Sequence, residues 1–167
     1  MEDLMKKLIE AVIEGIKDTF KIMMSTEVSA EEPVQVKKME APKVDDPIFV
    51  RKGITGAIGF VGTLSGIFSV YFDEELSKKV ASLMLGEDIN EINEDVKSAV
   101  GEIANIAIGR AKTIMNAYGC RIEISPPTII HGKSYMITPK VDEDRVLIPF
   151  KLPNSKDTFY VEVGIKR

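Results

Sequence analysis

The sequence contains one cysteine, one histidine and no tryptophan among its 167 residues. Because Cys120 has no second thiol to pair with, no disulfide can form within the chain, as is usual in the reducing cytoplasm. A Ser/His/Asp triad would depend on His131, and a zinc site would have to combine His131 with Cys120 without the usual close ligand spacing. We therefore expect a cytoplasmic protein with no metal site and no cofactor of its own.

An excess of positive charge is also absent. The formal net charge is −4 and the calculated pI is about 5.2, which gives the chain no electrostatic reason to bind nucleic acid or an anionic membrane. The hydrophobic share of 44% and the charged share of 29% are typical of folded proteins. A chain of this length suits one domain or a compact pair of pseudo-repeats.

One stretch of twenty residues, 53–72, has no charge and is therefore a candidate membrane helix. Five glycines and four Ser/Thr residues dilute it, however, and Phe68, Val70 and Phe72 alternate with Ser69 and Tyr71. That period of two favours strands, with a hairpin turn at residues 62–63. We expect a strand hairpin here, and a membrane-tethered helical protein is the alternative.

The rest of the chain alternates between helical and strand patterns. Apolar residues three or four apart predict a first helix over residues 3–24, and the stretch 25–47 reads as a mobile loop with an edge strand. A short helix should begin after Asp73 and end at Gly86, and a long one should run from Asn93 to Gly119. Strands are expected at 50–61, 64–72, 121–131, 133–138, 144–151 and 157–165. This order predicts an α+β fold with a largely antiparallel sheet.

The long helix has residues of poor helix propensity on the face opposite its core. Its predicted buried stripe comprises Val96, Val100, Ile103, Ala107, Ala111, Ile114 and Tyr118. Ser98, Glu102, Asn105, Gly109 and Asn116 lie on the other side. An interior glycine costs about 1 kcal/mol relative to alanine, so a merely solvated face would be more stable without Gly109. A loss of stability without a packing reason indicates that these residues serve a function. The ordinary interpretation is that they are simply the polar side of an amphipathic helix.

Glu102 and Asn105 are three residues apart and therefore neighbours on one ridge. Glu102 should be ionised at pH 7 and can pair with a partner's lysine, and Asn105 can both donate and accept hydrogen bonds to orient water. Neither is a strong nucleophile. The pair makes chemical sense if the reactive bond and its metal arrive with the substrate, and Gly109 would leave room for that partner.

This stretch resembles the chemotaxis phosphatases of the CheC, CheX and FliY family. Their motif has Asp or Ser, then Glu four residues on, Asn three further on, and Pro a little over twenty residues later. Ser98, Glu102 and Asn105 match the first three positions, and Pro126 or Pro127 matches the last. The first helix contains no second Glu and Asn so spaced, which points to the single-site CheX branch.

The resemblance implies a single CheX-like domain over residues 1–167, with a sheet packed against a long helix and two further helices. It also implies a homodimer whose substrate is a phosphorylated CheY-like response regulator that carries Mg²⁺. Asn105 would orient the attacking water, Glu102 would contact the receiver's lysine, and Ser98, Ile106 and Gly109 would touch the receiver. The alternative is a non-catalytic binding module similar to the middle domain of FliM.

Overall fold

The computed structural model describes residues 2–36, 50–137 and 142–167, which form three helices and one eight-stranded sheet. Every strand pair in the sheet is antiparallel. The central order is β1-β7-β8-β4-β3-β5, with β2 also paired to β7 and β6 also paired to β3. The elements are α1 (Glu2–Met24), β1 (Ser29–Ala30), β2 (Val34–Val36), β3 (Arg51–Gly62), β4 (Gly66–Asp73), α2 (Glu74–Leu85), α3 (Glu94–Ala117), β5 (Ile122–Ile124), β6 (Thr128–Tyr135), β7 (Glu143–Lys151) and β8 (Thr158–Lys166).

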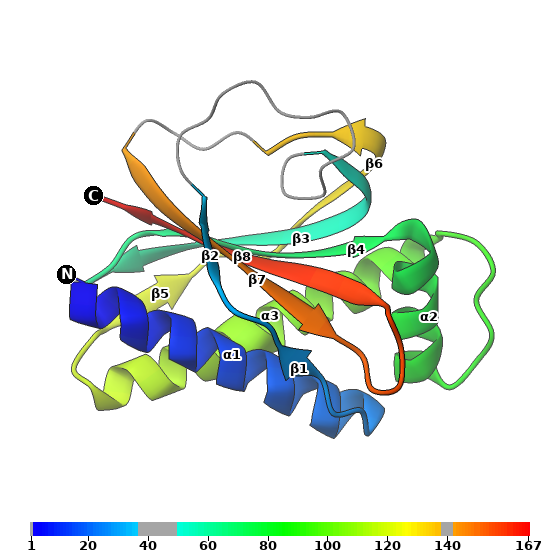
Figure 1. Cartoon of the computed structure of the whole chain (residues 1–167), viewed down its shortest axis with the longest axis horizontal. Helices are drawn as coiled ribbons and strands as arrows, with labels where there is room; N and C mark the ends of the chain where they lie inside the picture. Colours follow the sequence, from blue (N-terminus) through cyan, green and yellow to red (C-terminus); the bar gives the residue numbers. More distant parts are fainter. Residues whose placement is uncertain (1, 37–49, 138–141) are drawn as a thin grey trace.

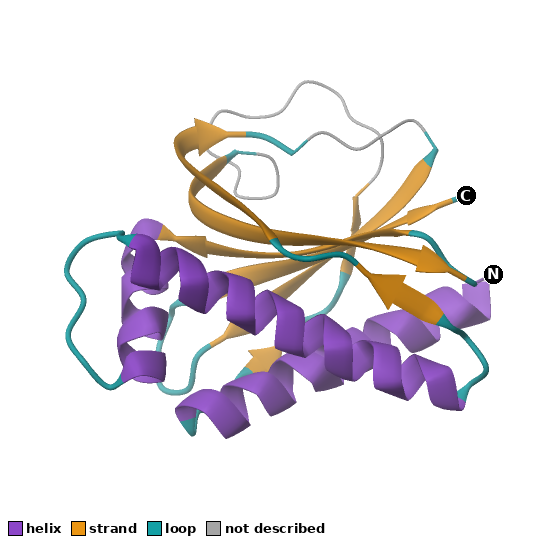
Figure 2. Cartoon of the chain, turned by 180° about the vertical axis from the view of Figure 1, so that it is seen from behind, coloured by secondary structure: helices purple, strands orange, loops and turns teal. Residues whose placement is uncertain are grey.

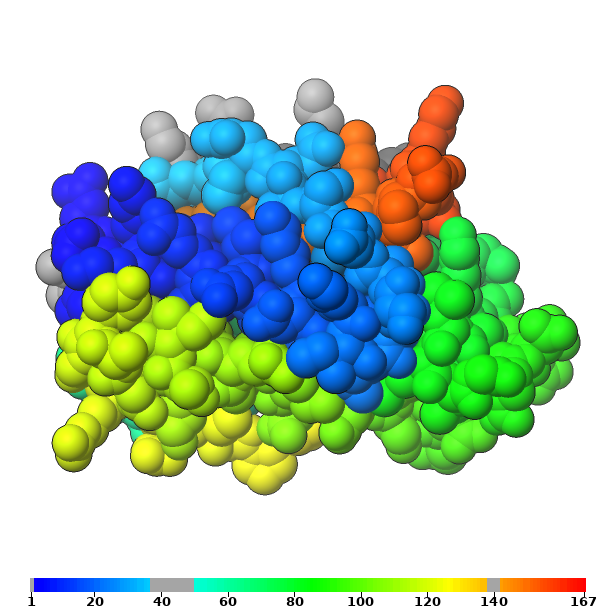
Figure 3. Space-filling view, turned by 90° about the horizontal axis from the view of Figure 1, so that it is seen from below, coloured from blue at the N-terminus to red at the C-terminus, as the bar shows by residue number. Residues whose placement is uncertain are grey.

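The helices cover one face of the sheet. Helices α1 and α3 lie side by side along that face and α2 stands at one end, as Figures 1 and 2 show from opposite sides. In the space-filling view from the helix side, α1 and α3 form two adjacent bands (Figure 3). Their contact is close, because a Cβ added to Gly15 would collide with the carbonyl oxygen of Ala107. The predicted α+β architecture is confirmed.

The core between helices and sheet is apolar and partly aromatic. Phe20 of α1 stacks on Phe159 of β8 with ring centroids 4.9 Å apart, and Phe150 of β7 stacks on the same ring at 5.2 Å. All three side chains are fully buried. The amphipathic first helix is therefore held to the sheet by burial of its apolar face, which is the dominant favourable term in folding.

Residues 53–72 form the predicted hairpin and not a membrane helix, with the turn at residues 63–65 instead of 62–63. Strands β3 and β4 pair in register from Gly53 opposite Asp73 to Phe60 opposite Gly66. No helix in the described ranges is long and apolar enough to cross a membrane. The alternative that residues 53–72 form a membrane helix is thus wrong, because the glycines and the period of two in this stretch suit a sheet.

The predicted helix ends are confirmed by their capping hydrogen bonds. The Asp73 side chain accepts from the amide of Leu76 at 2.7 Å, and the Asn93 side chain accepts from the amide of Val96 at 3.1 Å. Gly86 and Gly119 adopt left-handed conformations with φ of 70° and 76° where α2 and α3 stop. These caps fix where α3 begins and hence which residues its outer face presents.

Three further details differ from the sequence prediction. Tyr118 was expected in the buried stripe but is 58% exposed, because it caps the end of α3 and packs its ring under the Lys7 amine 5.0 Å away. The expected strands 121–131 and 133–138 are instead 122–124 and 128–135. Strand pairing breaks at the prolines of residues 126–127, which lack an amide hydrogen, and continues through Gly132.

The edge strand expected within residues 25–47 is present. β1 and β2 both pair with β7, and β2 covers residues 34–36. Residues 37–47 of the expected mobile loop lie outside the described residues.

Candidate functional site

The outer ridge of α3 is set by how its inner face packs on β3. Gly56 of β3 lets the helix approach so closely that an added Cβ would lie 3.3 Å from atoms of Val100 and Ala104. Val96, Val100, Ile103 and Ala107 are all 1% exposed or less. This packing fixes the rotation of the helix, so residues half a turn away point to solvent.

The structure places Ser98, Glu102 and Asn105 together on the exposed side of α3, as expected. Ile106 and Gly109 flank them and are half-buried. We call these five residues the α3 ridge. In residues 2–36, 50–137 and 142–167, the side chains of Ser98, Glu102 and Asn105 make no hydrogen bond or ion pair. Their polar groups are therefore available to another molecule.

Basic side chains near the ridge are engaged by other acidic groups. Arg110 pairs with Asp18 of α1 at 3.5 Å, and Lys112 pairs with Glu123 of β5 at 2.7 Å. Lys97 pairs with Glu94 at 3.2 Å. Because these cations have their own partners, the Glu102 carboxylate stays without a neutralising ion pair and can accept a cation from outside.

The two glycines of α3 have different surroundings. Gly101 is buried, and a Cβ there would lie 3.3 Å from Cδ1 of Ile129 and 3.6 Å from Cγ of Pro127. Close packing against the start of β6 therefore favours a small residue at position 101. A Cβ on Gly109 would meet nothing within 4 Å, so no contact within the described protein requires a glycine at that position.

The contact between Gly101 and Pro127 also bears on the proline of the motif. Gly101 is three residues after Ser98 and four before Asn105, so Pro127 approaches α3 beside the ridge. This placement favours Pro127 over Pro126 as the counterpart of the family's proline. Sequence reasoning did not anticipate this contact, although a glycine in the middle of a helix next to buried positions is a signal of close packing.

The residues considered for metal binding lie apart from the ridge. His131 is exposed on β6, whereas Cys120 is buried beyond the end of α3, and burial raises the pKa of its thiol. Within the described ranges, no three His, Cys, Asp or Glu side chains gather as a metal site would need. What the ridge offers chemically is one carboxylate, one carboxamide and one hydroxyl.

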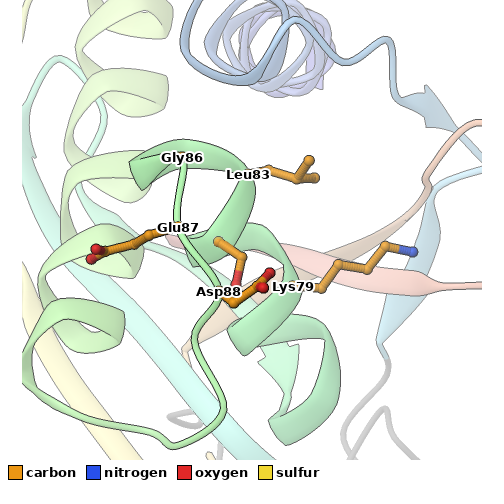
Figure 4. Close-up of a pocket in the computed structure, with 6 residues that line it drawn as sticks. Lys79, Leu83, Gly86, Glu87 and Asp88 are labelled. Carbon is orange, nitrogen blue, oxygen red and sulfur yellow. The ribbon is translucent and has the colours of Figure 1, made fainter.

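A hollow of about 460 Å³ lies at the end of α2 (Figure 4), lined by Lys79, Ser82, Leu83, Gly86, Glu87 and Asp88. Lys79 and Glu87 point away from each other, and Lys79 pairs with Asp157 at 2.7 Å. The Ser82 hydroxyl donates to the carbonyl of Lys78 and accepts from the amide of Ile89. The polar groups around this hollow therefore do not converge on a common point.

Comparison with known proteins gives a consistent result. Residues 54–151 match the sequence model of a protein family described as chemotaxis phosphatase CheX. This range includes α3 and most of the sheet. A CheY-P phosphatase CheX of Thermotoga maritima is 26% identical over 132 residues, covering 78% of this chain and 79% of that protein.

Solved structures agree with these sequence matches. A CheC-like superfamily protein from Shewanella sp. PV-4 superposes with a TM-score of 0.81 and 26% identity, covering 96% of this chain and 98% of that one. The CheX chain of a CheX–CheY–BeF3–Mg²⁺ complex from Borrelia burgdorferi superposes with a TM-score of 0.75. It is 24% identical, with 95% of this chain and 97% of that chain covered, and it shows the same fold.

Proposed function

Because the chain belongs to the chemotaxis phosphatase CheX family, we propose that it hydrolyses the aspartyl phosphate of a CheY-like response regulator. In this proposal Asn105 orients the attacking water and Glu102 contacts the receiver's lysine. The relative from Thermotoga maritima is a CheY-P phosphatase, and the neighbour from Borrelia burgdorferi was solved with CheY. Both support a receiver as the substrate.

One observation carries the assignment of residues. Glu102 and Asn105 stand exposed on a rigid helix, on one ridge and without a partner in the described part of the chain. A helix is a precise platform, because its packed inner face holds outward side chains in a fixed relation. Such a pair can enter the cleft of another protein without first breaking contacts of its own.

The reaction needs a water molecule aligned with the bond that breaks. Water attacks the phosphorus, the bond between phosphorus and the aspartyl oxygen breaks, and inorganic phosphate and a free carboxylate result. The Oδ1 atom of Asn105 accepts a hydrogen bond from this water and holds it in line. The Glu102 carboxylate accepts a hydrogen bond from the receiver's lysine and sets the position of the helix over the phosphate. Charge on the phosphoryl oxygens is neutralised by Mg²⁺ that belongs to the receiver.

The remaining ridge residues would form the edge of the contact. Ser98 lies one turn before Glu102 and offers a hydroxyl, and Ile106 offers a half-buried apolar surface beside Asn105. Gly109, with open space where a side chain would be, lets a loop of the receiver approach the helix backbone. The ridge thus combines polar groups that act on the reaction with a low surface that admits the receiver.

A phosphate-release assay tests this proposal. The phosphorylated receiver is mixed with wild-type protein, Glu102→Ala or Asn105→Ala, and Asn116→Ala is the matched control because it is exposed on the same helix outside the ridge. We expect Asn105→Ala to lower the acceleration by about 100-fold, as for loss of one oriented group in other active sites. Asn116→Ala should act like wild type. Equal acceleration by Asn105→Ala and wild type would remove Asn105 from the mechanism.

The second candidate function is a binding module similar to the middle domain of FliM. It predicts that the protein binds the phosphorylated receiver without shortening the lifetime of the phosphate. A binding measurement run beside the phosphate-release assay separates the two, since the module binds without acceleration.

By the same family resemblance we propose that residues 1–167 form one domain and that the protein works as a cytoplasmic homodimer. The expected mass in light scattering is twice that of the 18.5 kDa chain. A mass of one chain at the concentrations of the assay contradicts the dimer without affecting the assignment of the ridge.

A further inference from the structure

The helix-free face of the sheet contains a cavity of about 180 Å³, which we call the sheet cavity. It lies on the side of the sheet opposite α1 and α3, where β3 and β6 curve away from the helices (Figure 1). Its lining comes from five strands and the second residue after β6, and comprises Ala57, Ile67, Ser69, Ile130, Ile137, Glu143, Arg145, Glu162 and Gly164.

Small residues in register create the hollow. Ala57, Ser69 and Glu162 are directly opposite one another on β3, β4 and β8. In the neighbouring row, Gly164 of β8 separates Ile67 from Arg145. Because residues paired across antiparallel strands point to the same side, the small side chains leave a depression between larger ones.

Charged groups at the base of the cavity are paired with each other. Glu162 is 5% exposed and accepts from Arg145 through one oxygen, and its other oxygen lies 3.4 Å from Nη2 of Arg51. Arg145 also donates to the carbonyl of Ile137 at 2.9 Å. Together with the carboxylate of Glu143, the two arginines and two glutamates sum to zero formal charge. A charged ligand would therefore lose its hydration without gaining an unpaired counter-charge.

The Ser69 hydroxyl, which belongs to the lining, is buried without a hydrogen-bond partner among the described residues. Ser69 is 2% exposed, and its hydroxyl makes no hydrogen bond within the described part of the protein. Buried hydroxyl groups are nearly always hydrogen-bonded, so an unpaired one that lines a cavity is a place for a ligand's polar atom. The hydroxyl can both donate and accept, which suits a hydroxyl or amide on the ligand.

We propose that the sheet cavity binds a small uncharged molecule that has an apolar body and a hydroxyl or amide head group. The head group bonds to Ser69, and the apolar body contacts Ala57, Ile67 and Ile130. A cavity of about 150 Å³ in an engineered protein accommodates benzene, so a ligand of similar size fits. Ile67 is 41% exposed and marks where the cavity opens to solvent.

Three probes with one ring and different charge test the proposal, namely benzyl alcohol, benzylamine and benzoate. Titrations followed by amide NMR shifts should show saturable binding of benzyl alcohol in the millimolar range, with shifts on β4 and β8. Benzylamine and benzoate should bind at least about tenfold more weakly. No saturable shift with benzyl alcohol, shifts that map elsewhere, or tighter binding of a charged probe overturns the proposal.

Two variants locate the site. Gly164→Ala adds a methyl group 3.5 Å from Cγ of Arg145, an ordinary contact that narrows the cavity, and Ser69→Ala removes the hydroxyl. Each variant should bind benzyl alcohol at least about tenfold more weakly than wild type. Unchanged binding by both variants contradicts the proposed site. Their phosphatase activity should equal that of wild type, because the cavity and the α3 ridge lie on opposite sides of the sheet.

Stability of the free protein distinguishes a ligand-binding hydroxyl from a structural one. Ser69→Ala should leave the thermal midpoint unchanged or higher, because its hydroxyl has no bond to lose. Ser77 is the matched control, since it is fully buried and donates to the carbonyl of Glu74 at 2.7 Å. Ser77→Ala should lower the midpoint. A larger decrease for Ser69→Ala than for Ser77→Ala makes the hydroxyl structural and overturns the proposal.

Discussion

At the scale of single residues, the choice of glycine in α3 separates packing from function. A Cβ at Gly101 would fit tightly, 3.3 Å from Cδ1 of Ile129, whereas a Cβ at Gly109 would have no atom of the described protein within 4 Å. Helix propensity disfavours glycine at both positions by about 1 kcal/mol relative to alanine. Only at position 109, therefore, does glycine lower the stability of the helix without a contact in the described protein that favours a small residue.

Replacing Gly109 should have opposite effects on stability and activity. Gly109→Ala should raise the free energy of unfolding by about 1 kcal/mol, because the added methyl group stiffens the unfolded chain and meets no atom. The same methyl group should weaken receiver dephosphorylation by obstructing close approach. Urea unfolding and phosphate release measure the two effects.

Asn116→Ala is the control for this change, since it also removes a poor helix former from an exposed position of α3. It should stabilise the protein and leave phosphate release as in wild type. If Gly109→Ala retains full activity, the idea that this glycine makes room for the receiver is wrong.

At the scale of elements, β8 contributes the buried carboxylate of Glu162, whose removal should destabilise the sheet. Glu162 lies between Arg51 and Arg145, and burial lowers the pKa of the Arg51 guanidinium while the Glu162 carboxylate opposes that shift. Arg51 is 2% exposed and also donates to Thr55 at 3.1 Å. The three charges therefore depend on one another.

Glu162→Gln should destabilise the protein by about 3 to 5 kcal/mol, because it leaves two buried guanidinium groups without their counter-charge. Chemical denaturation measures the loss. Glu31→Gln is the control, since Glu31 pairs with Lys151 at 3.2 Å on the surface and such pairs contribute less than about 1 kcal/mol. Similar small losses for both variants would show that the buried cluster contributes no more than a surface pair.

Most elements could be predicted from the sequence, because their signals are local. The apolar period of α3, its cap at Asn93 and the alternation through β4 each involve neighbouring residues, and so does the exposed spacing of Glu102 and Asn105. One error has a non-local cause, because the position of Tyr118 depends on where α3 ends relative to α1. The break between β5 and β6 has a local signal in the prolines of residues 126–127, but which residues on either side pair with β3 is set by the folded sheet.

The sheet cavity could not be predicted, because its lining residues come together only through pairing between distant strands. Ser69, Arg145 and Glu162 are far apart in sequence, and each looks like an outward-facing polar residue of an alternating strand. They become a buried cluster only when β4, β7 and β8 align in register and the helix-free face is curved. By contrast, the α3 ridge needs only one helix, so its residues could be proposed from their spacing alone.

At the scale of the whole molecule, buried ionisable groups connect stability to pH. Burial raises the pKa of the Cys120 thiol and of the Tyr71 and Tyr135 hydroxyls. The folded protein therefore keeps these protons at pH values where the unfolded chain has begun to lose them. This contribution is complete well below about pH 8.5, the ordinary pKa of an unfolded thiol, and decreases as pH rises through that value.

The free energy of unfolding should consequently decrease between about pH 8.5 and pH 10.5. Urea unfolding at a series of pH values measures the trend. Cys120→Ala should reduce the slope in the lower part of this range, where the thiol ionises first. A constant or increasing stability over the same range would contradict the assignment of these groups as buried and protonated.

The molecule as a whole divides its two faces between different tasks. The helix side exposes the α3 ridge, where we propose that the receiver binds, and the opposite side holds the buried charges and the sheet cavity. Gly56 and Ala57 are adjacent on β3, the first against α3 and the second in the cavity lining. The sheet thus supports both surfaces with a single layer of strands.

The central claim is that Asn105 acts on the reaction while Glu102 positions the receiver, and single-turnover decay of the receiver's phosphate at increasing protein concentration tests it most directly. The account predicts that Asn105→Ala lowers the plateau rate by about 100-fold with little change in the half-saturating concentration. Glu102→Ala should raise that concentration by about tenfold or more. A plateau rate for Asn105→Ala equal to that of wild type would contradict the account.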